Sequence, residues 1–311
     1  MSDRHSYRSE KINYSDCLAP RFWPTWIALA AMRLIANLPH TLQIGLGKLL
    51  GLLIYRLARS RRHIAETNIA LCFPELSATT QKQLAKDSII ENAIGFVETC
   101  IAWWNPERIT PAHITVEGEE HLRLAREQGR GVLLVGAHYS TLDLGGLLVS
   151  HVDKVSVMYR AHKNPLFNLA MQNARIRFCN SVIERSNMRE VIRCFKKGDI
   201  VWYAPDQDYG RKHSVFAPFF DIDAATITAT SRIAKINKSP VLILGHHRNS
   251  NNKGYTISYT PLNTEFPSGD DVVDATVINQ ALETQIKKHP AQYMWVHRRF
   301  KTRPQGQEKI Y

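Results

Sequence analysis

From residue 114 onward, short apolar runs alternate with helical patterns, and this alternation constrains the fold more than any other feature. Seven runs are predicted strands, at residues 114–117, 131–137, 154–159, 181–183, 199–203, 241–246 and 255–259. Predicted helices lie between most of them, at 118–128, 141–150, 164–178, 187–197 and 225–238, and one more follows at 272–288. The order predicts an α/β fold, with a mixed, largely parallel central sheet flanked by helices.

Longer helical patterns precede this region. Residues 77–104 predict one helix, with Ser77 as its N-cap and Pro106 just beyond its end. Residues 23–38 are apolar except for Arg33, but these 16 residues fall short of the roughly 20 that span a bilayer. Residues 41–58 carry a leucine stripe at helical spacing, made of Leu42, Leu46, Leu49, Leu50, Leu53 and Leu57.

Interfacial residues flank this N-terminal apolar region. Trp23 and Trp26 lie at one end and four arginines (Arg56, Arg59, Arg61 and Arg62) at the other, which is typical of a membrane-associated helix or hairpin. We therefore expect a polar tail and a membrane-associated helical anchor over residues 1–62, and a single α/β domain over 63–311. Whether the anchor spans the bilayer stays open, and two core helices of a soluble domain are the alternative.

The net charge of +12 is confined to the two ends of the chain. Residues 1–63 hold ten basic and three acidic groups, and residues 287–311 hold seven and one, so the part between them is nearly neutral. Basic ends around a neutral body fit an anionic membrane surface better than a nucleic acid, which we do not expect as a partner. A solvated basic surface is the simpler alternative.

Cysteine spacing and the first residues indicate the compartment. The five cysteines lie far apart without a C-x-x-C pair, so neither a zinc ribbon nor a disulfide framework is predicted, and a reducing compartment is expected. The first twenty residues are polar and mixed in charge, so we expect no cleavable signal peptide.

The sharpest junction for chemistry is GVLLVGAHYSTLDLGG, at residues 131–146. In open α/β sheets, ligands collect outside the carboxyl ends of strands. His138 follows such a strand, Ser140 or Thr141 can cap the next helix, and Asp143 lies in its first turn. We expect His138 to act as a general base whose imidazolium is stabilised by Asp143. A structural histidine is the alternative, because His5 and Glu10 have the same spacing in a polar tail.

Two other chemistries are weaker. GAHYSTL lacks the G-x-S-x-G pattern of a nucleophile elbow, and helix capping accounts for Ser140. Asp206 and Asp208 resemble a D-x-D metal site of a nucleotide-sugar transferase, but no nucleotide-binding glycine pattern accompanies them. An active-site loop after the strand at 199–203 explains them equally well.

A basic cluster follows the strand at 154–159. It contains Arg160, His162, Lys163 and Asn164, with Arg175 and Arg177 on the next helix. Guanidinium groups bind phosphate bidentately, so a cluster at the same sheet edge as His138 predicts an anionic substrate. Solvated surface arginines are the alternative, more so for Arg177 than for Arg160.

Several blocks in one order resemble the bacterial lipid A biosynthesis late acyltransferases, the lauroyl/myristoyl group of the lysophospholipid acyltransferase superfamily. They are HIAETNIALCFPE, ENAIGFVETCIAWW, GVLLVGAHYSTLDLGG, MYRAHKNP, WYAPDQDYG, SVFAPFF followed by ATITATSRIAK, FPSGD and QYMWVHRRFKTRP. The resemblance implies transfer of a fatty acyl chain from acyl carrier protein to a hydroxyl of an acyl chain on a Kdo-bearing lipid A precursor. It also implies the cytoplasmic face of the bacterial inner membrane, and neither a metal nor another cofactor.

The resemblance assigns roles to six residues. The family's H-x4-[DE] base and acid fall on His138 and Asp143, although many members have Glu at the acid position. Its arginine and the aspartate of its third block fall on Arg175 and Asp206, which we expect to lie close together as a charge pair. Arg160 and Asn164 belong to the YR-x-H-x-NP block and are expected to bind substrate.

Two other functions stay open. A glycerolipid acyltransferase would use the same histidine and aspartate on a different acceptor. A membrane-bound lipid-binding protein would keep the fold without turnover.

Overall fold

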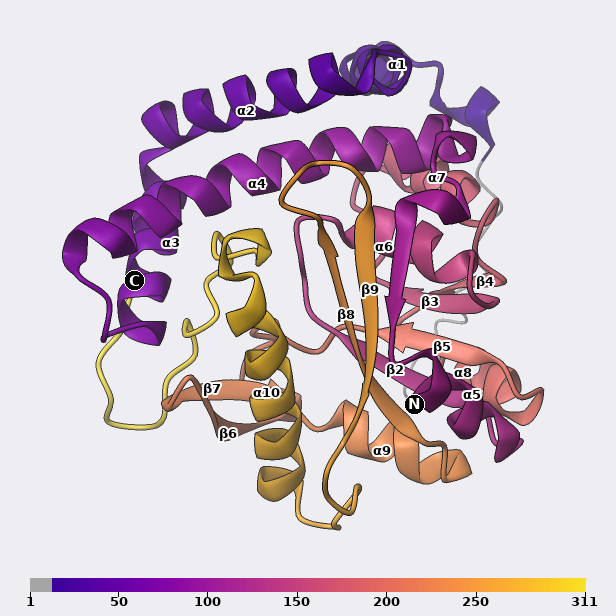
Figure 1. Cartoon of the computed structure of the whole chain (residues 1–311), viewed down its shortest axis with the longest axis vertical. Coiled ribbons are helices and arrows are strands. Elements are labelled where there is room, and N and C mark those ends of the chain that lie inside the picture. The colour runs from indigo at the N-terminus through magenta and orange to yellow at the C-terminus, as the bar shows by residue number, and fades with distance from the viewer. Residues whose placement is uncertain (1–12) are drawn as a thin grey trace, which may run out of the picture.

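In the computed structural model, which describes residues 13–311, a seven-stranded sheet carries helices on both faces (Figure 1). Its strands are β1 (Ile114–Glu117), β2 (Val132–Gly136), β3 (Val155–Tyr159), β4 (Ser181–Glu184), β5 (Ile200–Tyr203), β8 (Val241–Arg248) and β9 (Tyr255–Pro261). They lie in the order β1-β9-β8-β2-β5-β3-β4, and every neighbouring pair is parallel except β8 with β9. All seven predicted strands and the mixed, largely parallel sheet are confirmed.

The helices surround this sheet. They are α1 (Trp23–Ala36), α2 (His40–Leu57), α3 (Arg59–Cys72), α4 (Ala78–Trp104), α5 (Glu119–Glu127), α6 (Leu142–Ser150), α7 (Pro165–Arg175), α8 (Met188–Lys196), α9 (Ala229–Asn237) and α10 (Asp271–Lys288). The long helix predicted from Ser77 is confirmed, because the Ser77 hydroxyl caps α4 by accepting a hydrogen bond from the Thr80 amide at 3.2 Å. Three of the ten basic groups counted in residues 1–63, namely Arg4, Arg8 and Lys11, lie outside the described residues.

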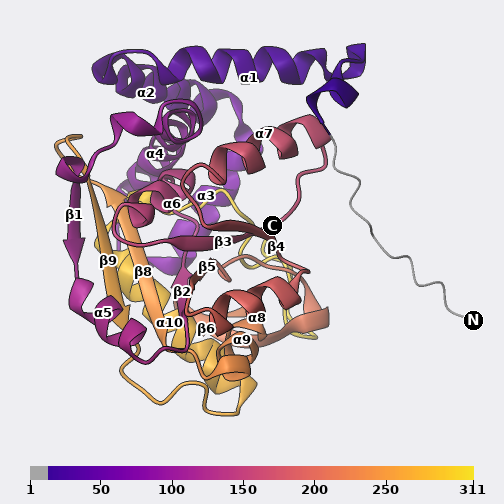
Figure 2. The same cartoon turned by 90° about the vertical axis from the view of Figure 1, so that its right-hand side faces the viewer.

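Two hydrophobic cores lie on opposite faces of the sheet, because successive strand residues point to opposite sides. Trp202 of β5 packs with α1, α6 and α7 in one core, and its neighbours Val201 and Tyr203 pack in the other with α3, α8 and α10. Helix α4 contributes to both cores, with Trp103 in the first and Ile89 in the second. Figure 2 shows α1, α2, α4 and α7 at one end of the molecule and α8 and α9 at the other.

The predicted leucine stripe exists, but much of it faces outward. Helix α2 packs on α4 through Gly47 and Gly51, and a Cβ added at Gly51 would lie only 2.5 Å from the Ile90 Cα. On the far side of α2, the side chains of Leu49 and Leu57 are 64% and 71% exposed. Glycine thus brings the two helices close together and leaves the leucines without a partner in the described chain.

Helix length and apolarity decide whether a segment within residues 13–311 could cross a bilayer. No single helix there is long and apolar enough to cross a bilayer, whereas α2 and α3 together pass this test but are bent by 93° at their junction.

One antiparallel hairpin, formed by β6 (Ser214–Phe219) and β7 (Ile222–Ile227), was not predicted from the sequence. The helix predicted at 225–238 was wrong at its start, because residues 225–227 belong to β7 and α9 begins at Ala229. The hairpin turn places Phe220 and Asp221 at φ of 50° and 61°, a conformation usually signalled by Asn or Gly. Asp221 is a residue type that tolerates this conformation, but Phe220 is not, and Pro218 is unfavourable within a strand.

Candidate active site

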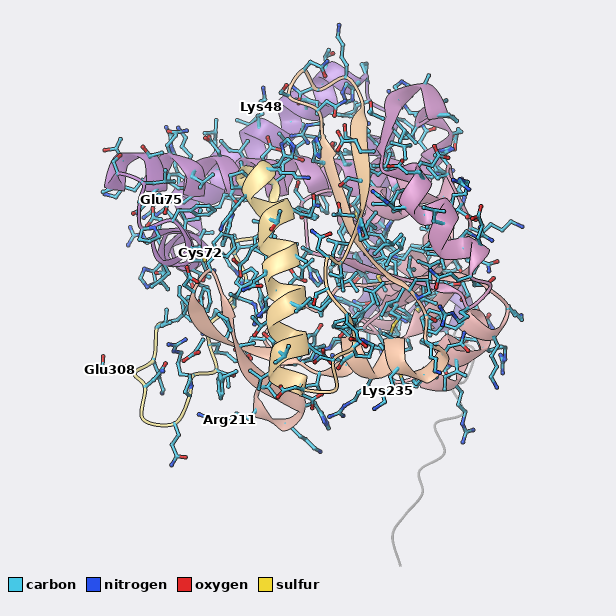
Figure 3. The ribbon with its side chains drawn as sticks, turned by 60° about the horizontal axis from the view of Figure 1, so that its bottom comes forward. Lys48, Cys72, Glu75, Arg211, Lys235 and Glu308 are labelled. Carbon is cyan, nitrogen blue, oxygen red and sulfur yellow. The ribbon has the colours of Figure 1, made fainter. Side chains whose placement is uncertain are left out.

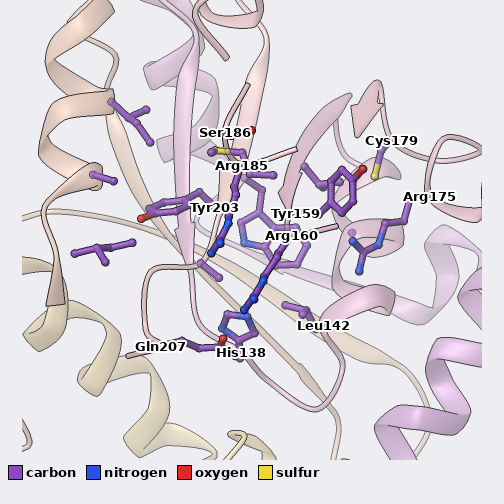
Figure 4. A pocket seen from close by; sticks show the side chains of 18 of the residues that line it. His138, Leu142, Tyr159, Arg160, Arg175, Cys179, Arg185, Ser186, Tyr203 and Gln207 are labelled. Atoms are coloured by element: carbon purple, nitrogen blue, oxygen red, sulfur yellow. The ribbon is translucent and has the colours of Figure 1, made fainter. Parts of the chain in front are cut away.

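A cavity of about 800 Å³ opens at the carboxyl ends of β2, β3, β4 and β5. His138, Asp143, Arg160 and Arg175 are among the residues that line it, so the structure brings four of the six predicted site residues together. Figure 4 shows His138 and Arg160 in its centre, with Tyr203 on one side and Arg175 and Cys179 on the other. The walls are largely apolar and include Trp202, Phe178 and Ile233.

His138 is held by Asp206 rather than by Asp143. The His138 Nδ1 lies 2.6 Å from the Asp206 Oδ1, and the backbone N–H of His138 donates to the Asp206 Oδ2 at 2.9 Å. One carboxylate therefore fixes both the main chain and the ring. A proton on Nδ1 satisfies this contact and leaves Nε2 as the ring nitrogen available to a substrate.

The charges of this pair support each other. Burial alone would lower the pKa of His138, but the charge of Asp206 and its hydrogen bond outweigh burial and raise the pKa above 6.5. Burial alone would raise the pKa of Asp206, yet the adjacent imidazolium and hydrogen bonds from His138 and Tyr293 lower it. Asp206 is only 2% exposed, so it is a buried anion poised to stabilise a protonated His138.

The predicted contact of Asp143 with His138 is wrong, as is the predicted pairing of Asp206 with Arg175. The Arg175 Nε at the end of α7 donates to the Asp143 Oδ1 at 2.7 Å, in an ion pair at the cavity wall. Burial alone would lower the pKa of Arg175, but Asp143 raises it. The two carboxylates have exchanged the partners that the sequence suggested.

Arg160 and Asn164 are the two predicted site residues still to be placed, and only Arg160 lies at the cavity. The Arg160 side chain is exposed and lines the cavity. Asn164 is not among the lining residues; its Oδ1 caps α7 by accepting from the Phe167 amide at 3.1 Å, and its Nδ2 donates to the Thr25 Oγ1 of α1 at 2.7 Å. Asn164 thus ties α7 to α1.

Thr141 also differs from expectation. It is the N-cap residue of α6, but no side-chain capping bond forms there. The Thr141 hydroxyl instead lies 2.7 Å from the buried His246 Nδ1. Burial, followed by the charges of His247 and His138, lowers the pKa of His246 to about 3, so this second histidine is a neutral packing partner beneath the active-site turn.

The C-terminal segment supports the active-site turn from behind. The His138 carbonyl accepts from the Met294 amide at 3.0 Å, and the Ser140 amide donates to the Gln292 carbonyl at 2.7 Å. Asp208 accepts from the Thr302 amide at 2.6 Å and from its hydroxyl at 2.9 Å. The two aspartates of the D-x-D sequence therefore bind different partners. Within residues 13–311, no group of three or more His, Cys, Asp or Glu side chains is placed to hold a metal ion.

A protein-family model described as bacterial lipid A biosynthesis acyltransferase matches residues 11–302. The chain belongs to this family. It is 36% identical over 295 residues to two Escherichia coli (strain K12) proteins, the lipid A biosynthesis palmitoleoyltransferase and lauroyltransferase, covering 94% of this chain and 96% of each relative. It is 28% identical over 300 residues to the lipid A biosynthesis myristoyltransferase of the same organism, covering 94% and 91%. The chain is thus an acyltransferase of lipid A biosynthesis.

Residues that the sequence analysis did not single out complete the site of this lipid A acyltransferase. Arg185, directly after β4, lines the cavity and places its guanidinium 5.4 Å from the centre of the Tyr209 ring. The strand-end rule that found His138 and Arg160 would also have found Arg185. Tyr293 had no comparable signal, because its contact with Asp206 depends on how the C-terminal segment folds back.

Proposed function

We propose that this chain transfers a fatty acyl group from acyl carrier protein to the hydroxyl of an acyl chain on a Kdo-bearing lipid A precursor. The names of its relatives support lipid A as the pathway and fatty acyl groups as the transferred unit. The observation that carries the chemistry is the His138–Asp206 pair, in which His138 lines a largely apolar cavity.

His138 acts as the general base in this proposal. The Nε2 takes the proton of the acceptor hydroxyl while the hydroxyl oxygen attacks the thioester carbonyl, and Asp206 stabilises the imidazolium. The carbon–sulfur bond then breaks, the ester remains on the lipid, and the imidazolium returns the proton to the leaving thiolate. The thioester is already an activated donor, so the proposal needs no acyl-enzyme, metal or other cofactor.

Arg160 and Arg175 form the part of the site that faces the anionic groups of the lipid acceptor. Arg160 is exposed at the cavity and available to a phosphate or carboxylate of the acceptor. Arg175 is already paired with Asp143, so we assign this pair the role of fixing the cavity wall and orienting the acceptor. Asp143, Arg175, Arg160 and Asp206 keep a part in the proposed site, whereas Asn164 supports it from behind by joining α7 to α1.

We also propose that the chain works on the cytoplasmic face of the bacterial inner membrane. The exposed apolar side chains of α1 and α2, such as Ile27, Leu34 and Leu49, support insertion into the bilayer surface. Acyl carrier protein reaches the site from the aqueous side, and the substrates leave no role for a nucleic acid.

The test is a transfer assay with the purified full chain in lipid vesicles, acyl carrier protein thioesters and two alternative acceptors, a Kdo-bearing lipid A precursor and lysophosphatidic acid. We expect the Kdo-bearing lipid A precursor to gain one acyl mass by mass spectrometry, with turnover unchanged by excess chelator. Acylation of lysophosphatidic acid instead would identify a glycerolipid acyltransferase. Binding without any acylated product would identify a lipid-binding protein.

A further inference from the structure

The cavity has apolar walls on both faces of the central sheet. Trp202 and Tyr203 are consecutive residues of β5, so their side chains point to opposite faces, and both line the cavity. Each belongs to a different hydrophobic core. The cavity therefore wraps around the carboxyl edge of the sheet, next to His138.

Its two parts have distinct walls. The α7 branch is lined by Gly146, Val157, Met171, Phe178, Cys179 and Trp202. The α9 branch is lined by Met188, Tyr203, Ile227, Ala229 and Ile233. In Figure 4, Cys179 lies in the α7 branch and Tyr203 in the α9 branch, with His138 between them.

We infer that each branch holds one of two acyl chains: the donor chain in the α9 branch and the chain bearing the acceptor hydroxyl in the α7 branch. This inference rests on the proposed function, in which both substrates bring a hydrocarbon chain to His138. In a single channel the two chains would compete for the same space. Two branches that meet at His138 instead bring the thioester carbonyl and the hydroxyl together from opposite sides of the sheet.

The surroundings of the α7 branch favour the lipid acceptor. Helix α7 is tied to α1 by the bond from Asn164 to Thr25, and α1 exposes Ile27 and Leu34 at 70% and 72%. A lipid held in the bilayer by its other chains would reach this branch by the shortest route. The Asp143–Arg175 pair and Arg160 at the same side supply polar contacts for its head group.

The surroundings of the α9 branch favour a soluble donor. Arg185 and His213 line the cavity on this side, and exposed basic side chains lie close to them in the chain: Arg189 in the first turn of α8, and Arg211 and Lys212 directly before His213. Figure 3 shows Arg211 and Lys235 at the opposite end of the molecule from Lys48 of α2. An acidic carrier protein would find complementary charge there, away from the apolar faces of α1 and α2.

Two matched substitutions separate the branches. Ala229→Leu narrows the α9 branch and Gly146→Leu narrows the α7 branch, where an added Cβ would lie 3.3 Å from the Phe178 ring. Transfer by the full chain in vesicles is measured with carrier-protein thioesters of graded length and one acceptor. We expect Ala229→Leu to favour shorter donors by about tenfold in kcat/KM for each methylene that no longer fits, with the acceptor KM unchanged. Gly146→Leu should raise the acceptor KM and keep the wild-type donor preference.

Substitutions that enlarge a branch test the same assignment, because they should shift the chain-length preference in the opposite direction. A shift toward longer chains is not a result that misfolding would produce. Ile233→Ala should move donor preference toward longer chains, Met171→Ala should not, and Ile236→Ala on the outer side of α9 is the control. If the α7 substitutions set the donor preference, or if substitutions in both branches do so, the two-branch inference is overturned while the proposed function stands. If the wild-type chain transfers no acyl group from the carrier, the proposed function fails and the inference fails with it.

Discussion

Asp206 bridges the main chain and the ring of His138, with one carboxylate oxygen 2.9 Å from the backbone nitrogen and the other 2.6 Å from Nδ1. The bridge sets the position and the tautomer of the imidazole at once. Because the carboxylate is buried, its charge acts on the ring with little screening by water. We propose that the pair acts as one catalytic unit.

His138→Ala should abolish transfer without unfolding the protein. Loss of a general base costs roughly 10²- to 10⁴-fold in kcat. The measurement is turnover in vesicles alongside thermal unfolding, with His162→Ala, a histidine outside the cavity lining, as the matched control. Near-normal turnover of His138→Ala would remove the histidine from the mechanism.

Asp206→Asn should move the acid limb of the pH profile of kcat/KM to lower pH. His138 must be neutral to accept a proton, and Asp206 holds its pKa above 6.5. The wild-type rate should therefore fall as pH drops through a midpoint above 6.5. Removing the negative charge leaves burial as the dominant influence, so the midpoint should fall, while kcat drops because the imidazolium loses its counter-charge. An unchanged midpoint would mean that another group controls the limb.

Asp143→Asn should act on acceptor binding rather than on the base. The substitution removes the charge that balances the largely buried Arg175 guanidinium, so the cavity wall should shift. We expect a higher KM for the lipid acceptor, a lower Tm and an unchanged midpoint of the acid limb. Glu127→Gln, which breaks the exposed pair with Arg123, is the control and should change none of these. A shift of the midpoint would restore Asp143 as the partner of His138.

The sheet and its functional edge followed from the sequence because they depend on local patterns. Apolar runs located all seven strands of the main sheet, and the strand-end rule put His138 and Arg160 at one edge. The pairing of charges did not follow. Asp206 is separated from His138 by 68 positions, and the packing of α6 turns Asp143 toward Arg175, which no local spacing records.

The cavity walls were less predictable still. Ile227 reaches the cavity from the β6–β7 hairpin, which was not predicted and whose turn includes Phe220 at positive φ, a conformation that Phe rarely adopts. The glycines of α2 also gave no local pattern that predicts which face of the helix packs on the protein. Leucine spacing predicted an apolar stripe, but only the close approach of Gly51 to Ile90 determines which side of α2 faces the protein and which faces outward.

The outward face of α2 yields the last prediction. Leu49, Leu53 and Leu57 are 64%, 49% and 71% exposed, and changing all three to Gln should release the chain from membranes while its packing on α4 stays intact. Burial of apolar area contributes about 25 cal/mol per Å² and is not screened by salt, so high salt should leave the wild-type chain in the membrane fraction. The matched control changes Ile236, Val272 and Val273 to Gln, because these are similarly exposed on α9 and α10, and it should stay with the membrane. Flotation with vesicles of anionic phospholipid gives the bound fraction of each variant. Release of the wild-type chain by salt would show that charge holds the protein at the membrane. Retention of the α2 variant would show that the leucine face of α2 is not what holds it there.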